Sequence, residues 1–492
     1  MKFLVLSENG NGTWPYLYYR GMGALELHKR IQQHGYQSTL IDWFTVWSPD
    51  KLTSAIQAWF GDEVNPVIAI STPFDITDVY KIKEVLAQAR TRYPNLKVIH
   101  GGSRTYNPQI KDIDVFFLGR SMQVFDAWLK GTDLTVYTVN TDPLVLVNKN
   151  FDQTVDTPVL PKLDDNDFLT PYDILGFEIG VGCKFNCTFC NYELRGAKVT
   201  TLTDSYTLKQ YFEEAHAKYG IRYFFAADDT PNETDDKLAI LADAVDGLSF
   251  KPKITAYSRL DIITGRPQQL ELYRRIQFDS LFFGIESFNN NASRLVRKKS
   301  DIGSVEQTLK DLRRLCPDTF TVGGIIIGLN GDSESSIRSS LDRVVEQQLL
   351  DSVQLYPLSI SRSRYITDPG YHSALDNDPA GNGYPITGLL EFHRGNSAVQ
   401  NLNWTSDWSN SIDAGELSQQ LYLDYRDKIN TINFMEYTGL NALGLAKRDL
   451  YLTPTQVWQS QAMAKSSRLK LNYIDKKLNW LLTNSNQSCI VV

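Results

Sequence analysis

Three closely spaced cysteines, Cys183, Cys187 and Cys190, constrain this chain more than any other feature. They follow the spacing C-x3-C-x2-C in a chain of 492 residues that has five cysteines in all. Closely spaced thiols of this kind usually bind a soft metal centre. Three thiolates leave one iron of a four-iron cluster without a protein ligand, so that iron is open to a small molecule. Zinc is the competing metal, but the nearest histidine, His216, lies beyond a predicted helix.

A regular alternation of apolar runs and helical patterns begins at Ile174 and continues to about residue 357. Six strand–helix units of this kind predict an open, partial (βα)6 TIM-like barrel, and barrel enzymes place their chemistry at the carboxyl ends of the strands. The predicted strands are 174–181, 221–227, 253–257, 280–286, 320–328 and 352–357, and the predicted helices are 206–218, 234–247, 267–277, 302–315 and 333–348.

The ends of these predicted strands are polar or rich in glycine, which a purely structural loop does not require. The first strand ends in the cysteine loop. Because the carboxyl ends of barrel strands meet at one face, we expect all of these side chains to surround one site. The other strand ends read Ala226-Ala227-Asp228-Asp229-Thr230, Tyr257-Ser258-Arg259-Leu260-Asp261, Gly284-Ile285-Glu286-Ser287, Gly328-Leu329-Asn330-Gly331 and Tyr356-Pro357.

The cysteine spacing, with Phe189 just before the last cysteine, resembles the signature of the radical S-adenosylmethionine (SAM) superfamily. In that family the three cysteines hold a [4Fe-4S] cluster, and the amino and carboxylate groups of SAM chelate the fourth iron. One electron from the cluster then cleaves SAM to methionine and a 5′-deoxyadenosyl radical. The resemblance implies these two cofactors, with Phe189 among the SAM contacts, and an external electron donor such as flavodoxin or ferredoxin.

The strand ends resemble the SAM-binding motifs of the same family in the right order. Asp228 and Asp229 match the position that binds the amino group of SAM, and a carboxylate suits an ammonium group. The alternative is that they cap the next helix, which Thr234 could do instead. Ser258 and Arg259 match positions that face SAM, and the guanidinium of Arg259 could pair with the carboxylate of SAM.

Two further strand ends extend this resemblance. Glu286 matches the residue that accepts hydrogen bonds from the ribose hydroxyls. Gly328 belongs to the strand and turn that packs on adenine, where glycine lets the backbone approach closely. The basic run that includes Arg297 and Lys298 is expected to be a solvated helix face, although an anionic substrate could use it.

The first third of the chain alternates apolar strands with helices, which predicts a Rossmann-like, doubly wound parallel sheet. The runs "KVIHGG" and "DVFFLGR" make it resemble the cobalamin-binding domain that precedes many radical SAM barrels. The D-x-H-x-x-G run that supplies the cobalt ligand in many such domains is absent after the first strand. Cobalamin could therefore bind with no histidine on cobalt, or the domain could keep the fold without the ligand. The cobalamin pocket predicted from the strand ends consists of Ser71, Thr72, Gly101, Gly102 and Gly119.

These patterns predict four segments. Residues 1–135 form the cobalamin-binding-like domain, 136–172 a linker and 173–358 the radical SAM barrel. Residues 359–492 are loop-rich and then mostly helical, and we expect them to close the barrel and shape the substrate site.

The net charge and the apolar runs of the sequence indicate which kinds of partner the protein has. The net charge of −7 and the pI near 5.5 argue against a large nucleic-acid footprint. The apolar start ends at Ser7, too early for a signal peptide, and no apolar run reaches the length of a membrane span. We therefore expect a cytoplasmic enzyme without membrane partners, acting on a small molecule or a peptide.

The leading hypothesis is cobalamin-dependent methylation of an unactivated carbon, with the 5′-deoxyadenosyl radical removing hydrogen. The alternative is a cobalamin-independent radical rearrangement, epimerisation or bond formation. A third hypothesis, a non-catalytic iron–sulfur or zinc protein, does not explain the polar strand ends. No residue is assigned a catalytic role from the sequence.

Overall fold

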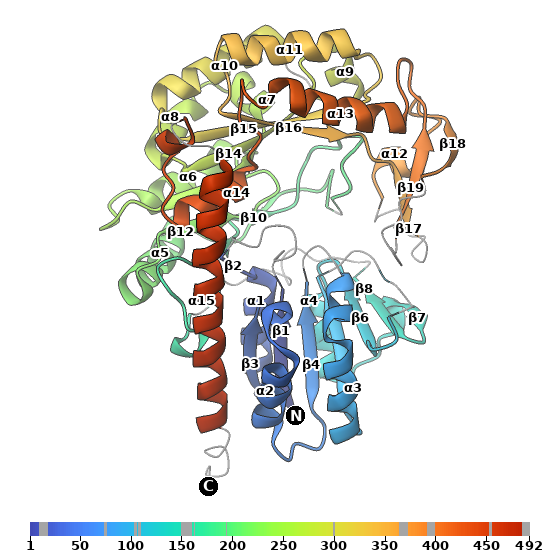
Figure 1. Cartoon of the computed structure of the whole chain (residues 1–492), viewed down its shortest axis with the longest axis vertical. Helices are drawn as coiled ribbons and strands as arrows, with labels where there is room; N and C mark the ends of the chain where they lie inside the picture. The colour runs from blue at the N-terminus through green and yellow to red at the C-terminus, as the bar shows by residue number, and fades with distance from the viewer. Residues whose placement is uncertain are drawn as a thin grey trace. The chain divides into compact units, whose positions relative to one another are not determined.

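The computed structural model groups the chain into two units, Met1–Gly176 with Lys218–Ile221 and Ala442–Val492, and Phe177–Ala217 with Arg222–Asn441. Figure 1 shows the elements of both, coloured along the chain. The residues described are 1–8, 18–72, 76–102, 106, 110–148, 160–161, 163–192, 194–298, 301–363, 372–390, 399–451 and 455–484.

The first unit contains a seven-stranded sheet of order β3-β1-β4-β5-β6-β8-β7, in which every pairing except β7–β8 is parallel. Helices α1 and α4 bury one face, where Phe3, Val5 and Phe117 form the core with Leu25 and Phe125. The right-handed crossover rule places α2 and α3 on the other face. This is the doubly wound arrangement expected from the sequence. The bounds are β1 Lys2–Ser7, α1 Met22–Gln33, β3 Gln37–Asp42, α2 Pro49–Phe60, β4 Val67–Ser71, α3 Lys83–Arg92, β5 Lys97–Gly101, β6 Val115–Leu118, α4 Met122–Leu129, β7 Thr138–Thr141 and β8 Leu144–Val147.

The sheet continues into the segment expected to be a linker. Leu144–Val147 (β8) pairs in parallel with β6, and β7 pairs antiparallel with β8. The short apolar run LVLV was visible in the sequence, but its pairing partner could not be read from so short a run. The predicted domain boundaries themselves stay predictions.

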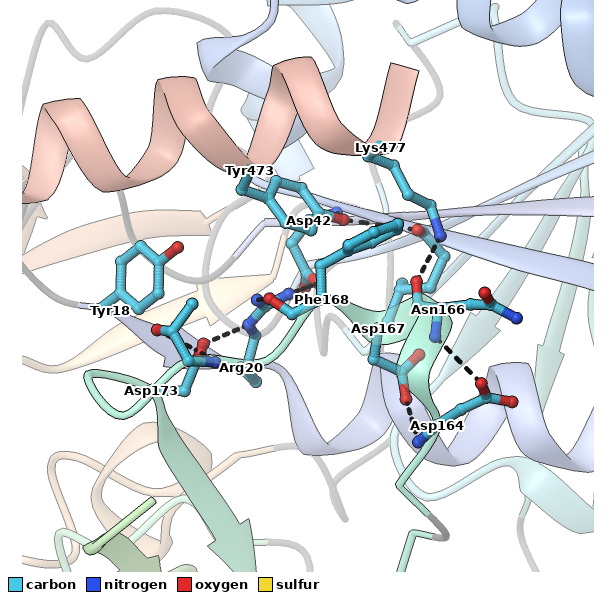
Figure 2. A network of polar contacts seen from close by, with 12 residues as sticks. Tyr18, Arg20, Asp42, Asp164, Asn166, Asp167, Phe168, Asp173, Tyr473 and Lys477 are labelled. Carbon is cyan, nitrogen blue, oxygen red and sulfur yellow. Dashed lines mark hydrogen bonds and ion pairs between the residues drawn. The ribbon is translucent and has the colours of Figure 1, made fainter. Parts of the chain in front are cut away.

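A buried charge network lies at the carboxyl end of β3 (Figure 2). The guanidinium of Arg20 pairs with Asp42 at 2.5 Å and with Asp173, and it also donates to the carbonyl of Phe168 at 3.3 Å. The ring of Tyr473, from the long helix α15 (Thr455–Asn484), lies 4.8 Å from this guanidinium. In the same unit α15 packs on α2. The last helix described in the chain thus belongs to the core of the first unit.

The second unit is built on the predicted barrel. The barrel sheet has the order β16-β15-β14-β13-β12-β9, with a short strand β2 paired in parallel beside β9; β2 and residues 174–176 of β9 fall within the first unit. All six strands and all five helices predicted from the sequence are present, which confirms the partial barrel. The bounds are β2 Tyr19–Arg20, β9 Ile174–Phe177, β10 Gly180–Val181, β11 Thr200–Thr201, α5 Ser205–Tyr219, β12 Tyr223–Ala226, α6 Asp235–Val245, β13 Lys253–Ser258, α7 Leu260–Gly265, α8 Gln269–Ile276, β14 Ser280–Glu286, α9 Asn290–Leu295, α10 Ile302–Leu315, β15 Phe320–Ile327, α11 Glu334–Glu346 and β16 Ser352–Pro357.

The region after the barrel is less irregular than its composition suggests. Strands β17 (Ser361–Ser363), β18 (Ile386–Leu389) and β19 (Val399–Trp404) form an antiparallel sheet of order β17-β19-β18. Helices α12 (Ala374–Asn377), α13 (Ser411–Tyr425) and α14 (Phe434–Ala442) follow in this region. Among the described residues, no helix is both long enough and apolar enough to cross a membrane.

Helix α14 meets the barrel at the amino ends of its strands. The hydroxyl of Thr438 lies 2.5 Å from that of Thr255 and 3.1 Å from that of Ser280, near the starts of β13 and β14. The amide of Asn441 donates to the carboxylate of Asp279 at 2.8 Å. A helix bound here closes the base of the barrel and leaves the carboxyl ends of the strands as the open face.

Candidate metal centre

The three cysteines lie on a loop that begins directly after β10. Pairing of β10 with β11 holds the base of this loop. Cys183 and Cys187 are buried and Cys190 is partly buried, and all three thiols are free. Burial raises the pKa of the Cys183 and Cys190 thiols. Among the described residues no three His, Cys, Asp or Glu side chains converge on one ion. A four-iron cluster does not need that convergence, because each cysteine binds a different iron.

Side chains from several other elements hold the cysteine loop in place. The guanidinium of Arg297 donates to the carbonyl of Asn186 at 3.1 Å, and the carboxylate of Glu233 accepts from the amide of Lys184 at 2.9 Å. The carbonyl of Thr188 accepts from the amide of Leu375 at 3.0 Å. The loop is therefore fixed from three directions. Arg297 is exposed, as its sequence interpretation requires, but it lies beyond the end of α9 and its side chain binds the cysteine loop.

Asp228 and Asp229, predicted together as SAM contacts, lie in different environments. The carboxylate of Asp228 is fully buried, accepts from the amides of Ile179 and Gly180 at 2.9 and 2.8 Å, and pairs with Lys237 at 2.6 Å. Asp229 is exposed. Asp228 therefore fixes the strand that leads into the cysteine loop, and the geometry favours Asp229 for the predicted ammonium contact. Helix α6 is capped by neither residue: the side chain of Thr234 caps it.

Ser258 ends β13 and Arg259 follows it, on the cysteine side of the barrel. The guanidinium of Arg259 donates to Cys187 Sγ at 3.0 Å and to both carboxylate oxygens of Asp261 at 3.1 and 2.7 Å. The buried hydroxyl of Ser258 lies 2.5 Å from that of Tyr273. Sequence reasoning placed Arg259 near SAM but did not indicate the sulfur contact.

Glu286 adopts a backbone conformation that is unusual for a residue with a side chain. Its φ is +67°, at a register shift between β14 and β15. A conformation of this kind costs about 1–3 kcal/mol and is concentrated at functional sites. The carboxylate is 3.3 Å from Lys298 Nζ, which also donates to the carbonyl of Gly284 at 3.0 Å. Burial raises the pKa of Glu286, while the ammonium of Lys298 opposes that rise. Lys298 is thus a buried partner of a candidate site residue, and its predicted place on a solvated face is wrong.

Gly328 and Phe189 complete the predicted set. Gly328 has φ +104°, and a Cβ there would collide with the ring of Trp404 on β19. Its need for glycine therefore comes from close packing as well as from the backbone. Phe189 is partly buried within the cysteine loop.

An aromatic group inside the barrel had no signal in the sequence. The rings of Tyr257, Phe282 and Phe434 lie 4.7–5.5 Å apart between centroids. Tyr257 is 41% exposed and Tyr356 is 42% exposed. The alternation of side chains along β13 and β16 could have indicated inward positions, but not their exposure.

The first unit contains a separate pocket of about 180 Å³. Four of the five residues predicted as a cobalamin pocket line it, whereas Thr72 lies beside it with its hydroxyl 2.8 Å from His100 Nε2. Gly102 has φ +95°, and a Cβ there would lie 3.0 Å from the carbonyl oxygen of Thr72. The pocket residues are Gly23, Glu26, Leu27, Ile70, Ser71, Ile99, His100, Gly101, Gly102, Phe117, Gly119, Arg120, Ser121, Met122 and Phe125.

Two histidines near the first sheet, His28 and His100, are buried. Burial lowers the pKa of His100 to about 4, and its Nδ1 is buried without a hydrogen-bond partner. His28 is also buried, with Nδ1 2.8 Å from the hydroxyl of Ser38. Both histidines are therefore neutral parts of the protein interior near pH 7.

Residues 177–344 match the sequence family described as the radical SAM superfamily. The chain therefore carries a radical SAM domain, which confirms the assignment made from the cysteine spacing. A search of curated protein sequences finds no significant match.

The fold is similar to that of two solved radical SAM enzymes over nearly the whole chain. The methyltransferase TsrM from Kitasatospora setae, with cobalamin and a [4Fe-4S] cluster bound, has a TM-score of 0.61 at 12% identity, covering 95% of this chain and 100% of that one. The cobalamin-dependent enzyme OxsB, with aqua-cobalamin and SAM bound, has a TM-score of 0.57 at 14% identity, covering 99% of this chain and 81% of that one. The chain thus shares its overall fold with these two enzymes.

Proposed function

We propose that this chain binds a [4Fe-4S] cluster through Cys183, Cys187 and Cys190 and cleaves SAM reductively. The observation that supports the proposal most directly is three free thiols at a strand end of a barrel that matches the radical SAM superfamily. Their donor set fits the cluster, because soft thiolates suit iron and one iron is left for SAM. When bound, the cluster supplies the electron that generates a 5′-deoxyadenosyl radical.

The side chains of the barrel would hold SAM by charge and hydrogen bonding. The exposed carboxylate of Asp229 would accept from the ammonium group of SAM, and Glu286 would accept from the ribose hydroxyls. Lys298 holds the Glu286 carboxylate at 3.3 Å, so this acceptor is oriented before SAM binds. Glu286→Gln should weaken SAM binding with iron content unchanged. Unchanged affinity for SAM would contradict the ribose assignment.

We further propose that the first unit binds cobalamin and that the reaction is methylation of an unactivated carbon. The support is the likeness of the fold to cobalamin-dependent enzymes and a pocket at the carboxyl ends of β4, β5 and β6. Gly101, Gly102 and Gly119 present backbone without side chains there, which would allow a large ring system to approach. His100 is engaged by Thr72 through Nε2, which fits a cobalt centre without a histidine ligand from this pocket.

The deciding experiment is anaerobic reconstitution of the full chain with iron, sulfide and hydroxocobalamin, followed by desalting. Iron and corrinoid are quantified per chain, and SAM is assayed for 5′-deoxyadenosine and demethylated SAM. Stoichiometric corrinoid with both products supports the methyltransferase. Iron and 5′-deoxyadenosine without corrinoid would instead support the rearrangement alternative. Cys187→Ala should lose the iron, and retained iron and SAM cleavage in that variant would contradict the cluster assignment.

The substrate and the electron donor belong to the same proposal. We infer a small-molecule or peptide substrate that enters the open face of the barrel, where Tyr257 and Tyr356 are partly exposed. A low-potential protein such as a flavodoxin or ferredoxin would supply the electron. Replacing chemical reductant with a purified flavodoxin system in the SAM-cleavage assay tests the second point.

A further inference from the structure

Two contacts, with Asp261 and with Phe185, orient the guanidinium of Arg259. Its Nε and Nη2 donate to the two carboxylate oxygens of Asp261, and its Cζ lies 3.8 Å from the ring centroid of Phe185. The backbone amide of Arg259 donates to Asn232 Oδ1 at 3.0 Å. Arg259 and Asp261 are both buried to about nine-tenths at the side chain. The fork of the guanidinium therefore has one fixed orientation.

This orientation directs Nη1 at a sulfur. The Nη1–Sγ distance to Cys187 is 3.0 Å, which is short for a hydrogen bond to sulfur. Movement of the guanidinium toward a SAM carboxylate would break its bidentate pair with Asp261 and its stacking on Phe185. A bidentate pair of this kind is among the stronger polar contacts in proteins. Arg259, which the family resemblance would pair with the carboxylate of SAM, donates to Cys187 Sγ here.

We propose that Arg259 is a positioning residue that donates a hydrogen bond to the thiolate of Cys187 and raises the reduction potential of the cluster. The inference rests on the proposed function, since it requires the cluster. Reduction adds one electron from a low-potential donor and makes the cluster and its thiolates more negative. A hydrogen bond to a ligating sulfur stabilises that extra negative charge, and hydrogen bonds to sulfur are known to tune such potentials.

Because Arg259 is paired with Asp261, its effect on the cluster should come from its hydrogen bond to Cys187 rather than from its positive charge. Asp261 lies against Arg259 at 2.7 Å, so the field of the cation at the cluster is largely offset by the carboxylate. What the pair delivers to Cys187 is a directed N–H group. Lysine at this position would keep the charge but could not form the fork with Asp261 while donating to the sulfur.

The test is a redox titration of the reconstituted full chain without SAM, followed by electron paramagnetic resonance of the reduced cluster. At the potential where half of the unsubstituted clusters are reduced, Arg259→Gln should show a ratio of reduced to oxidised cluster about tenfold lower. That ratio corresponds to a shift of about 59 mV for a one-electron couple. Arg259→Lys should show nearly the same shift. An unshifted Arg259→Gln, or full restoration by Arg259→Lys, would overturn the proposal.

Arg297→Gln is the matched control. Arg297 also binds the cysteine loop, through the carbonyl of Asn186 at 3.1 Å, but it contacts no sulfur in the described structure. The reduction potential of the cluster in Arg297→Gln should equal that of the unsubstituted chain. A shift equal to that of Arg259→Gln would overturn the specific role of the sulfur contact. Where Arg259→Gln retains too little iron to titrate, Asp261→Asn replaces it. If the hydrogen bond to Cys187 matters, loss of the Asp261 carboxylate should disorder the Arg259 guanidinium and lower the reduction potential of the cluster. If only charge matters, removal of this negative charge would raise that potential.

The two proposals fail in different ways. Absence of iron from the reconstituted, unsubstituted chain contradicts the proposed function. A normal iron content with an unshifted potential in the Arg259 variants contradicts only the role of Arg259.

Discussion

Lys237→Met should destabilise the barrel by removing the charge that balances a buried carboxylate. Lys237 and Asp228 are 2.6 Å apart, with 1% and 0% of their side chains exposed. Removal of one partner of a buried pair costs about 3–5 kcal/mol. We expect a value near 3 kcal/mol, because Asp228 keeps its hydrogen bonds from the amides of Ile179 and Gly180. For a unit of this size that loss corresponds to a Tm lower by roughly 6–12 °C.

The assay is thermal unfolding of the full chain, followed by tryptophan fluorescence, in two backgrounds. In the Asp228→Asn background no carboxylate is left unbalanced, so Lys237→Met should lower Tm much less than in the original chain. An equal loss in both backgrounds would refute the electrostatic reasoning and assign the effect to packing of the lysine stem. Arg274→Met is the control: Arg274 pairs with Glu271 at 2.5 Å, and both side chains are more than half exposed. Solvent screening should make that loss much smaller than the loss in Lys237→Met.

Three further outcomes test other parts of the structure. The pKa of His100 lies at about 4, below its ordinary value near 6.5, so only the unfolded chain takes up this proton as pH falls between those values. The contribution of His100 to the free energy of unfolding should therefore be fully present above about pH 6.5 and should be lower by about 2 kcal/mol at pH 5. A His100→Gln chain with the same pH dependence of Tm would contradict this. Gly324→Ala places a Cβ 2.6 Å from Phe282 Cζ and should cost about 1–3 kcal/mol in a denaturant titration, whereas an unchanged midpoint would argue against the contact. Arg20→Met leaves two buried carboxylates unbalanced and should lower stability by about 3–5 kcal/mol, and a Tm within 2 °C of the original would be inconsistent with that cost.

The barrel could be predicted because its local signals agree with its tertiary structure. Each strand from Ile174 onward is a continuous apolar run, and each following helix has its own amphipathic pattern. The predicted strand 280–286 matches β14 at both ends. The predicted helix 302–315 matches α10 at both ends as well. Polar residues at the strand ends identified the open face for the same reason, since parallel strands in a barrel all end there.

The pairing of individual charges could not be predicted. Lys298 stands in a basic run that looks solvated, and only the bulge that turns Glu286 to a positive φ brings its carboxylate within reach. Asp228 and Asp229 are adjacent and chemically identical, yet one is buried against Lys237 and the other is exposed. Such differences depend on three-dimensional neighbours that no local pattern records.

Strand β8 of the first sheet and the small antiparallel sheet after the barrel could not be predicted either. Leu144–Val147 reads as an isolated apolar fragment because its partner, Val115–Leu118, lies across a helix. The antiparallel sheet formed by β17, β18 and β19 lies in a segment dominated by Gly, Asn and Asp, where strand propensity is low. Its strands are held by pairing with one another, which is a property of the folded chain rather than of any one run.

The place of α15 in the first unit has a consequence for synthesis on the ribosome. Tyr473 accepts a hydrogen bond from the amide of Asp42 at 3.0 Å, although the entire barrel is translated between them. At typical elongation rates the first strands would wait roughly 20–80 s for their last helix. During that interval the ion pairs of Arg20 would lack their aromatic cover, and the nascent first unit would be a natural client for chaperones. The barrel, which lies in the middle of the sequence, is therefore expected to finish folding before the first unit, which needs both ends of the sequence.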